Sequence, residues 1–174
     1  MRNVEYKTEL RDLEAARAQC HALGARFMGA FQQIDTYFRV PDGRLKRRET
    51  SGQPVEFILY RRPDRLTARM SEYSTYTEEQ ARSRWGMVSL KEWLTVIKNR
   101  ELFLLENVRI HLDRVRELGD YLEFEAVVRP PFGVKKCHEQ VAELREVFRP
   151  ITGETIAGSY SDLLARRIET PVDD

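Results

Sequence analysis

The stretch NVRIHLDRVRELGDYLEFEAVV, residues 107–128, decides the fold because it holds two strands and the turn that joins them. Residues 107–116 and 121–128 both alternate between apolar and polar side chains, which is the period of a β-strand. Leu118-Gly119-Asp120 between them is typical of a tight turn. The stretch therefore predicts an antiparallel hairpin with one apolar face and one face of ionisable side chains.

Similar elements are predicted on both sides of this hairpin. Further strands are predicted over residues 3–10, 31–40, 43–49, 55–62, 65–73 and 94–104, with turn-forming Pro, Gly and Asp between them. Helices are predicted from the N-cap Asp12 to Gly24, from Thr77 towards Trp93, over about 134–147, and over 160–166. Eight strands joined mostly by hairpin turns result.

These elements predict an α+β fold in which eight antiparallel strands close into a barrel. Closure is favoured because it removes the exposed edges of the sheet. The helices are then expected to pack on the outer wall, and residues 1–174 to form a single domain. A two-sheet sandwich has the same strand count and remains the alternative architecture.

Composition excludes several classes of protein. The 174 residues include 29 Lys+Arg and 28 Asp+Glu, and 41% are apolar, which excludes a disordered chain. No run of about 18 apolar residues predicts a membrane span, and the first five residues do not resemble a signal peptide. Cys20 and Cys137 lack zinc or redox spacing, so a reduced cytoplasmic protein is expected. A net charge of +1 argues against nucleic-acid binding.

Ionisable residues recur two positions apart in five of the predicted strands. These sets are Glu5 and Lys7; Lys46 and Arg48; Lys98 and Arg100; Arg109, His111 and Asp113; Glu123 and Glu125. Alternate residues of a strand share one face of the sheet. That face is either the solvated side of the sheet or the wall of a charged barrel interior, and the second arrangement favours a binding site because buried charges need partners.

The two kinds of charge suit the two parts of a metal–polyphosphate complex. Lys and Arg suit phosphate oxygens, and carboxylates suit Mg²⁺ or Mn²⁺. The cationic set is Lys7, Lys46, Arg48, Arg62, Arg69, Lys98, Arg100 and Arg109. The acidic set is Glu5, Asp113, Glu123 and Glu125.

Several motifs in order resemble one family. They are Asn3-Val4-Glu5-Tyr6-Lys7, Asp35-Thr36-Tyr37-Phe38, Leu45-Lys46-Arg47-Arg48-Glu49, Lys98-Asn99-Arg100, His111-Leu112-Asp113, Glu123-Phe124-Glu125 and Ser159-Tyr160-Ser161-Asp162-Leu163-Leu164. Together they span residues 3–164 and resemble the CYTH domain of the triphosphate tunnel metalloenzymes. That family includes class IV adenylate cyclases, thiamine triphosphatases and inorganic triphosphatases.

The resemblance implies a tunnel that binds a triphosphate-containing small molecule such as ATP with Mg²⁺ or Mn²⁺, in a monomer or homodimer. It implies metal ligands at Glu5, Glu123 and Glu125, and catalytic roles for Lys7, Lys98, Arg100 and Asp113. It implies substrate binding by Lys46, Arg48, Arg62, Arg69, Arg109 and His111. The expected reaction is triphosphate hydrolysis or adenylate cyclisation, and a non-catalytic polyphosphate-binding module is the alternative.

Two departures from the family pattern bear on these expectations. Asn3 stands where the signature has its first Glu, which removes one carboxylate from the metal set. Ser71 and Tyr73 stand where the family commonly has Arg and Glu, which suggests a substrate with an organic group. The register at Arg61-Arg62 stays open, because a slip of one residue exchanges the two faces.

Overall fold

Nine strands form one antiparallel sheet in this computed structural model, which describes residues 1–41, 43–61, 64–86 and 90–169. Their order is β5-β4-β3-β2-β6-β7-β8-β1-β9. The strands are β1 (Arg2–Leu10), β2 (Arg26–Arg39), β3 (Arg44–Thr50), β4 (Glu56–Arg61), β5 (Arg69–Thr77), β6 (Glu92–Leu105), β7 (Val108–Val115), β8 (Gly119–Val127) and β9 (Thr152–Thr155). The helices are α1 (Leu13–Ala22), α2 (Glu78–Trp85), α3 (Val134–Phe148) and α4 (Tyr160–Glu169).

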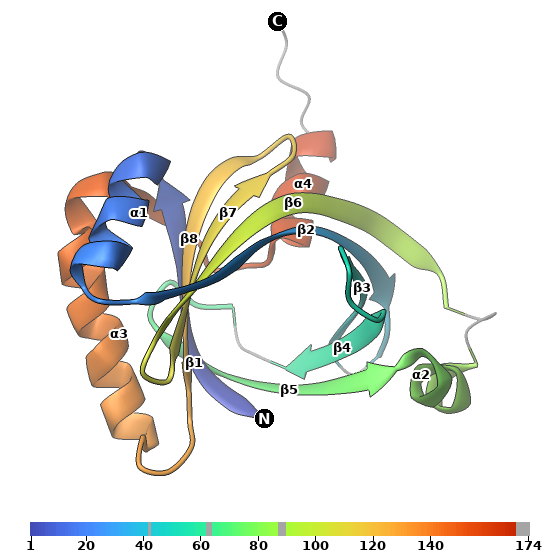
Figure 1. Cartoon of the computed structure of the whole chain (residues 1–174). Helices are drawn as coiled ribbons and strands as arrows, with labels where there is room; N and C mark the ends of the chain where they lie inside the picture. The colour runs from blue at the N-terminus through green and yellow to red at the C-terminus, as the bar shows by residue number, and fades with distance from the viewer. Residues whose placement is uncertain (42, 62–63, 87–89, 170–174) are drawn as a thin grey trace, which may run out of the picture.

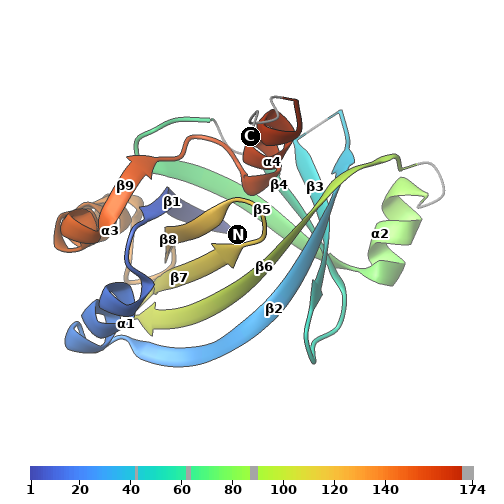
Figure 2. The same ribbon diagram turned by 90° about the horizontal axis from the view of Figure 1, so that it is seen from above.

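Strand β1 closes the first eight strands into a barrel. It pairs with β8 along most of its length and with β5 through Asn3↔Ser71 and Glu5↔Arg69. Figures 1 and 2 show the resulting ring of strands, with the helices packed outside it. The predicted eight-stranded antiparallel barrel is confirmed, and the sandwich alternative is wrong.

The apolar faces of the strands form a core outside the barrel wall. Apolar residues of β1, β7 and β8 pack with buried residues of α1 and α3, in a cluster that includes Val4, Ile110, Phe124, Val141 and Phe148. Figure 1 shows α1 and α3 on the same side of the barrel, against this wall. The helices therefore take the apolar faces, and the alternate side chains of these strands are left to point inward.

Four elements differ clearly from the sequence expectation. β9 was not predicted, because a four-residue strand shows no period; its pairing with Thr8 and Leu10 of β1 defines it. α2 ends at Trp85, before Gly86 with a φ of 55°, whereas Trp93 lies in β6. β2 begins five residues earlier than expected and so crosses more of the barrel, whereas β5 has the expected length but begins and ends four residues later.

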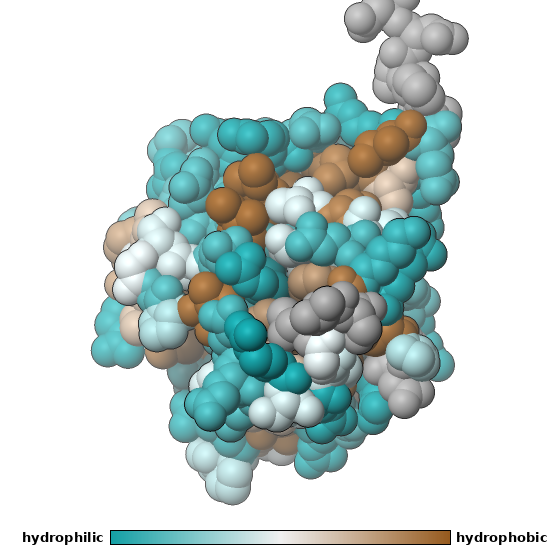
Figure 3. Space-filling view, turned by 90° about the vertical axis from the view of Figure 1, so that its right-hand side faces the viewer, coloured by the Kyte–Doolittle hydropathy of each residue, from teal (hydrophilic) through white to brown (hydrophobic). Residues whose placement is uncertain are grey.

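Helix α4 packs against one end of the barrel. Its residues Tyr160 and Leu164 join a cluster with Tyr37 of β2, Val96 of β6 and Tyr121 of β8. Each of these strand residues lies two positions from a charged residue on the same face of its strand, namely Asp35, Lys98 or Glu123, and we call this the α4 end of the barrel. The side that carries α2 is mainly hydrophilic, with apolar side chains gathered in its upper part (Figure 3).

Among the described residues, no helix is both long and apolar enough to span a membrane.

Candidate functional site

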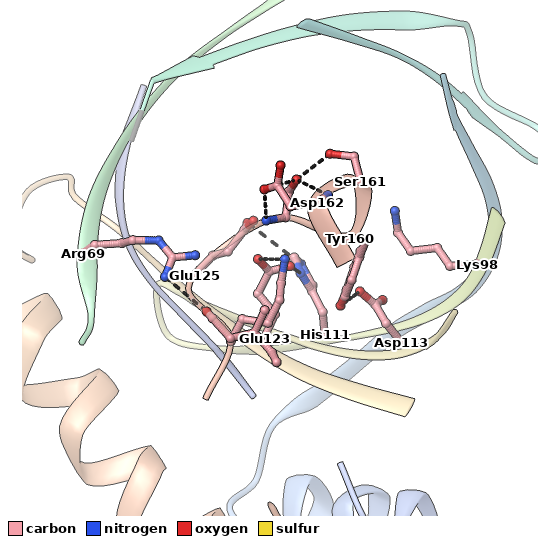
Figure 4. A network of polar contacts seen from close by, with 12 residues as sticks. Arg69, Lys98, His111, Asp113, Glu123, Glu125, Tyr160, Ser161 and Asp162 are labelled. Atoms are coloured by element: carbon pink, nitrogen blue, oxygen red, sulfur yellow. Dashed lines mark hydrogen bonds and ion pairs between the residues drawn. The ribbon is translucent and has the colours of Figure 1, made fainter. Parts of the chain in front are cut away.

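The barrel encloses a cavity of about 400 Å³, called here the central cavity, which is lined by all eight barrel strands and by α4. Ten of the thirteen residues predicted as site residues line it. They are Glu5, Lys7, Lys46, Arg48, Lys98, Arg100, Arg109, His111, Glu123 and Glu125. The side chains shown in Figure 4 converge inside the ring of strands from different walls.

These charges are inside the protein and do not form a solvated outer face. Lys98 is 2% exposed, Lys7 is 4% exposed and Glu123 is 6% exposed. Buried charges are costly unless they are paired or meet a ligand. The alternative of a solvated charged face is therefore wrong for this part of the sheet.

Two carboxylates and one imidazole form the acidic part of the cavity. One ligand atom from each of His111, Glu123 and Glu125 lies within 4.8 Å of the others. β7 and β8 are adjacent, and the register pairs His111 directly with Glu123, which brings these groups together. His111 Nδ1 lies 3.4 Å from a Glu123 oxygen.

Both carboxylates are held in the ionised form, and the imidazole in the neutral form. Burial opposes ionisation of Glu123, but Lys7 at 3.3 Å and Arg100 at 3.2 Å hold its pKa well below the usual range. Burial also opposes ionisation of Glu125, but Arg109 at 2.9 Å, together with His111, lowers the pKa of that carboxyl. Burial, together with Arg100, lowers the pKa of His111.

This donor set fits a divalent cation. Carboxylate oxygens suit Mg²⁺ and Mn²⁺, and a neutral imidazole nitrogen is a ligand that Mn²⁺ also accepts. Glu5 lines the same cavity and is the register partner of Glu125, although it is not part of the close set. The structure thus groups His111 with the carboxylates, whereas sequence reasoning placed it with the substrate-binding residues.

Asp35 is the centre of the cationic part of the site, and sequence reasoning gave it no role. Its carboxylate is fully buried and accepts two 2.7 Å hydrogen bonds from Arg48 and one 2.7 Å bond from Lys98. Lys46 Nζ lies 3.3 Å away. Burial opposes ionisation, but these three cations hold the pKa of Asp35 well below its usual range. One carboxylate therefore positions three cavity cations that come from β3 and β6.

Asp113 plays a comparable part for Arg100. The Arg100 guanidinium donates two 2.6 Å hydrogen bonds to the Asp113 carboxylate, and Tyr160 Oη donates a third at 2.7 Å. Arg100 outweighs the effect of burial and lowers the pKa of Asp113 to about 2. Asp113 is fully buried and is not among the cavity-lining residues. Its contacts are those of a group that orients Arg100 and Tyr160.

Two predicted cations, Arg69 and Arg62, are not among the described residues that line the cavity. Arg69 is 3% exposed, does not line the central cavity, and donates a 2.6 Å hydrogen bond to the backbone carbonyl of Arg65. Figure 4 shows it reaching in from the opposite side of the ring from Lys98. Arg62 lies outside the described residues, so the register question at Arg61-Arg62 is answered only for Arg61, which is exposed on β4.

The pKa values of Lys46 and Lys98 are both lowered from the ordinary value of a lysine. Burial lowers the pKa of Lys98 to about 7, with Arg48, Arg100 and Lys46 acting in the same direction and Asp35 opposing. Burial and Arg48 lower the pKa of Lys46 to about 8, again against Asp35. Tyr160 contacts this group as well, with Lys98 Nζ 5.7 Å from the centre of its ring. Both ammonium groups therefore lose their charge close to neutral pH.

The chain is similar in sequence and in fold to several known proteins. The model of the CYTH domain family matches residues 1–160. A candidate adenylate cyclase of Methanocaldococcus jannaschii is 26% identical, with 94% of this chain and 98% of that protein covered. A candidate adenylate cyclase of Vibrio parahaemolyticus has a solved structure with a TM-score of 0.71, 18% identity, and coverage of 94% of this chain and 97% of that one.

A third protein adds a different activity to these relatives. It is a candidate adenylyl cyclase of Hippeastrum, described as having a dominant triphosphatase activity. Its structure superimposes with a TM-score of 0.59 at 15% identity, covering 98% of this chain and 97% of that one. The solved structures share the fold, and the family match extends over most of the length. The chain belongs to the CYTH domain family.

Proposed function

We propose that this protein is a metal-dependent enzyme that acts on a triphosphate-containing organic or nucleoside substrate. The observation that carries the proposal is the meeting, in one cavity, of six cations with a set of two carboxylates and one imidazole. The cations are Lys7, Lys46, Arg48, Lys98, Arg100 and Arg109. Such a cavity can neutralise a polyphosphate and hold a divalent cation beside it.

Each group of residues has a proposed role. Lys46, Arg48 and Lys98, all held by Asp35, bind phosphate oxygens, and Arg100 and Lys7 stabilise charge that develops in the transition state. Glu123, Glu125 and His111 would hold Mg²⁺ or Mn²⁺, with Glu5 as a further carboxylate. The metal supplies polarisation of a phosphoryl oxygen or activation of the nucleophile.

Two reactions fit the same cavity, hydrolysis to phosphate and cyclisation of ATP with release of pyrophosphate. They differ in which phosphorus faces which nucleophile, and this depends on placement at the scale of an ångström. The relatives described above include both activities in their descriptions. We therefore propose triphosphate chemistry and leave the nucleophile to experiment.

Product analysis tests the proposal. We expect the protein with Mn²⁺ or Mg²⁺ to consume ATP, thiamine triphosphate or tripolyphosphate, and EDTA to stop the reaction. Phosphate as product identifies a triphosphatase, and cyclic AMP with pyrophosphate identifies a cyclase. Tight binding of these compounds without any product, with either metal, contradicts the enzyme proposal. It favours the alternative of a non-catalytic polyphosphate-binding module, in which the carboxylate missing at Asn3 is not needed.

The affinity for tripolyphosphate is expected to fall as the pH rises from 7 to 9. Lys98 and Lys46 have pKa values of about 7 and about 8, so both deprotonate in this range, and each loses a charge-assisted bond to phosphate. We expect a loss of about tenfold, to be measured by titration calorimetry without metal. Lys98→Arg, which stays charged, is expected to bind with a smaller fall. An identical fall in the two proteins contradicts the assignment to Lys98.

The remaining expectations belong to the same proposal. The two cysteines are free and buried, which supports a reduced cytoplasmic protein. A small-molecule substrate, no nucleic-acid partner, and a monomer or homodimer also stay predictions. Size-exclusion chromatography with light scattering measures the oligomeric state directly.

A further inference from the structure

The central cavity changes character along its length. From the α4 end, the alternate positions of β6 that follow Val96 are Lys98, Arg100 and Leu102. The alternate positions of β2 that precede Tyr37 are Asp35, Gln33 and Phe31. Both walls thus run from the α4 cluster through charged or polar side chains to an apolar side chain.

Phe31 and Leu102 lie next to each other at this far end. The register pairs Phe31 with Arg100, and Leu102 with Gly29, on the adjacent strands β2 and β6. Both side chains are half-buried and line the central cavity. Leu102 is in turn the register partner of His111 on the adjacent strand β7. The apolar pair therefore lies one strand away from this proposed metal ligand.

A glycine bulge holds the Phe31 ring in place. The β2–β6 register shifts between Phe27 and Gly29, and Gly29 has a φ of 140°, which side-chain-bearing residues rarely adopt. A Cβ at Gly29 would lie 2.7 Å from Phe31 Cζ, so the ring lies directly over the space that glycine leaves empty. The ring is therefore seated against the backbone and presents its other side to the cavity.

An unused polar atom lies beside this ring. Gln33, two positions along the same face of β2, is 7% exposed and lines the cavity. Its Nε2 donates to Thr50 Oγ1 at 3.3 Å, but its Oε1 has no hydrogen-bond partner among the described residues. Buried polar atoms are seldom left unpaired, and a ligand with a hydrogen-bonding edge satisfies such an atom.

We propose that Phe31, supported by Gly29 and Leu102, is the stacking platform for a planar heterocycle at the non-phosphate end of the substrate, with Gln33 at the edge of that heterocycle. The inference rests on the proposed triphosphate function and narrows its substrate to an organic triphosphate. Aromatic stacking is worth about 1–3 kcal/mol per ring by alanine substitution, equivalent to about 5- to 150-fold in affinity.

The test compares probes with and without a heterocycle on the full-length protein. ATP, thiamine triphosphate and tripolyphosphate are titrated calorimetrically without metal into wild type, Phe31→Ala, Phe31→Trp and Gly29→Ala. Phe31→Ala is expected to lower the affinity for ATP or thiamine triphosphate about tenfold or more, while the affinity for tripolyphosphate changes less than about twofold. Phe31→Trp keeps a ring and retains affinity, and Gly29→Ala displaces the ring and behaves like Phe31→Ala.

Phe27→Ala is the matched control. Phe27 lies on the same strand, is 49% exposed, packs 5.1 Å from the Phe103 ring, and does not line the cavity. An equal loss for ATP and tripolyphosphate in Phe31→Ala, no loss for either, or the same loss in Phe27→Ala overturns the platform. Binding of tripolyphosphate but of neither organic probe overturns it too, while sparing triphosphate chemistry. Failure of wild type to bind any of the three overturns the proposed function itself.

Discussion

Glu123→Gln is expected to lower metal-dependent turnover by at least about 100-fold. Substitution of a residue that only hydrogen-bonds to a metal ligand already lowers metal affinity or activity by about 10- to 100-fold, and loss of a ligand should cost more. Glu123 is the residue in which the two halves of the site meet. Its carboxylate contacts His111 on one side, and Lys7 and Arg100 on the other. The substitution keeps the shape of the side chain and removes its charge, so a divalent cation loses one of its two ionised carboxylate ligands.

The measurement is initial rate against Mn²⁺ concentration with ATP or tripolyphosphate. If the loss comes from metal binding, raising the Mn²⁺ concentration recovers part of the rate, which a damaged fold would not allow. Glu139→Gln is the matched control, because Glu139 is exposed on α3, where Lys135 lies 3.9 Å from its carboxylate. Turnover within about threefold of wild type in Glu123→Gln would remove Glu123 from the metal set.

The barrel and most of its lining could be predicted because a strand has a period of exactly two. One alternating strand is ambiguous, but Lys7, Arg100 and Glu123 come from different strands with the same apolar-out pattern. Placing the apolar faces on the outside of the barrel, under the helices, leaves a single space for the charged faces. That argument needs no knowledge of which strands are neighbours.

The residue roles that the sequence could not predict depend on which strands are adjacent in the sheet. Asp35 is one polar residue among many in an alternating strand, and its role arises only because β2 lies between β3 and β6 in the sheet. The same adjacency brings Lys46, Arg48 and Lys98 to one carboxylate. Arg69 has the right alternation, yet it lies outside the cavity lining, since alternation fixes the face of a strand and not the reach of its side chain.

Asp35→Asn is expected to lower the free energy of unfolding at pH 7 by about 3–5 kcal/mol, the usual cost of removing one partner from a buried ion pair. The carboxylate is fully buried and is the common partner of three cations, so the amide leaves their charges uncompensated. Urea denaturation followed by circular dichroism measures the loss. Asp64→Asn removes a carboxylate that Arg44 contacts at the surface and is expected to cost less than about 1 kcal/mol.

The pH dependence and the response to anions separate this electrostatic role from simple packing. The pKa of Asp35 is depressed in the folded protein, so its stabilisation is present above about pH 4 and is lost as the pH falls through the folded-state value. The difference between wild type and Asp35→Asn should therefore shrink below about pH 4. Saturating tripolyphosphate supplies negative charge to the same three cations and should restore part of the stability lost at pH 7. A loss that is unchanged by acid and by tripolyphosphate would mean that Asp35 fills space in the wall and does not balance the charge of the phosphate-binding cations.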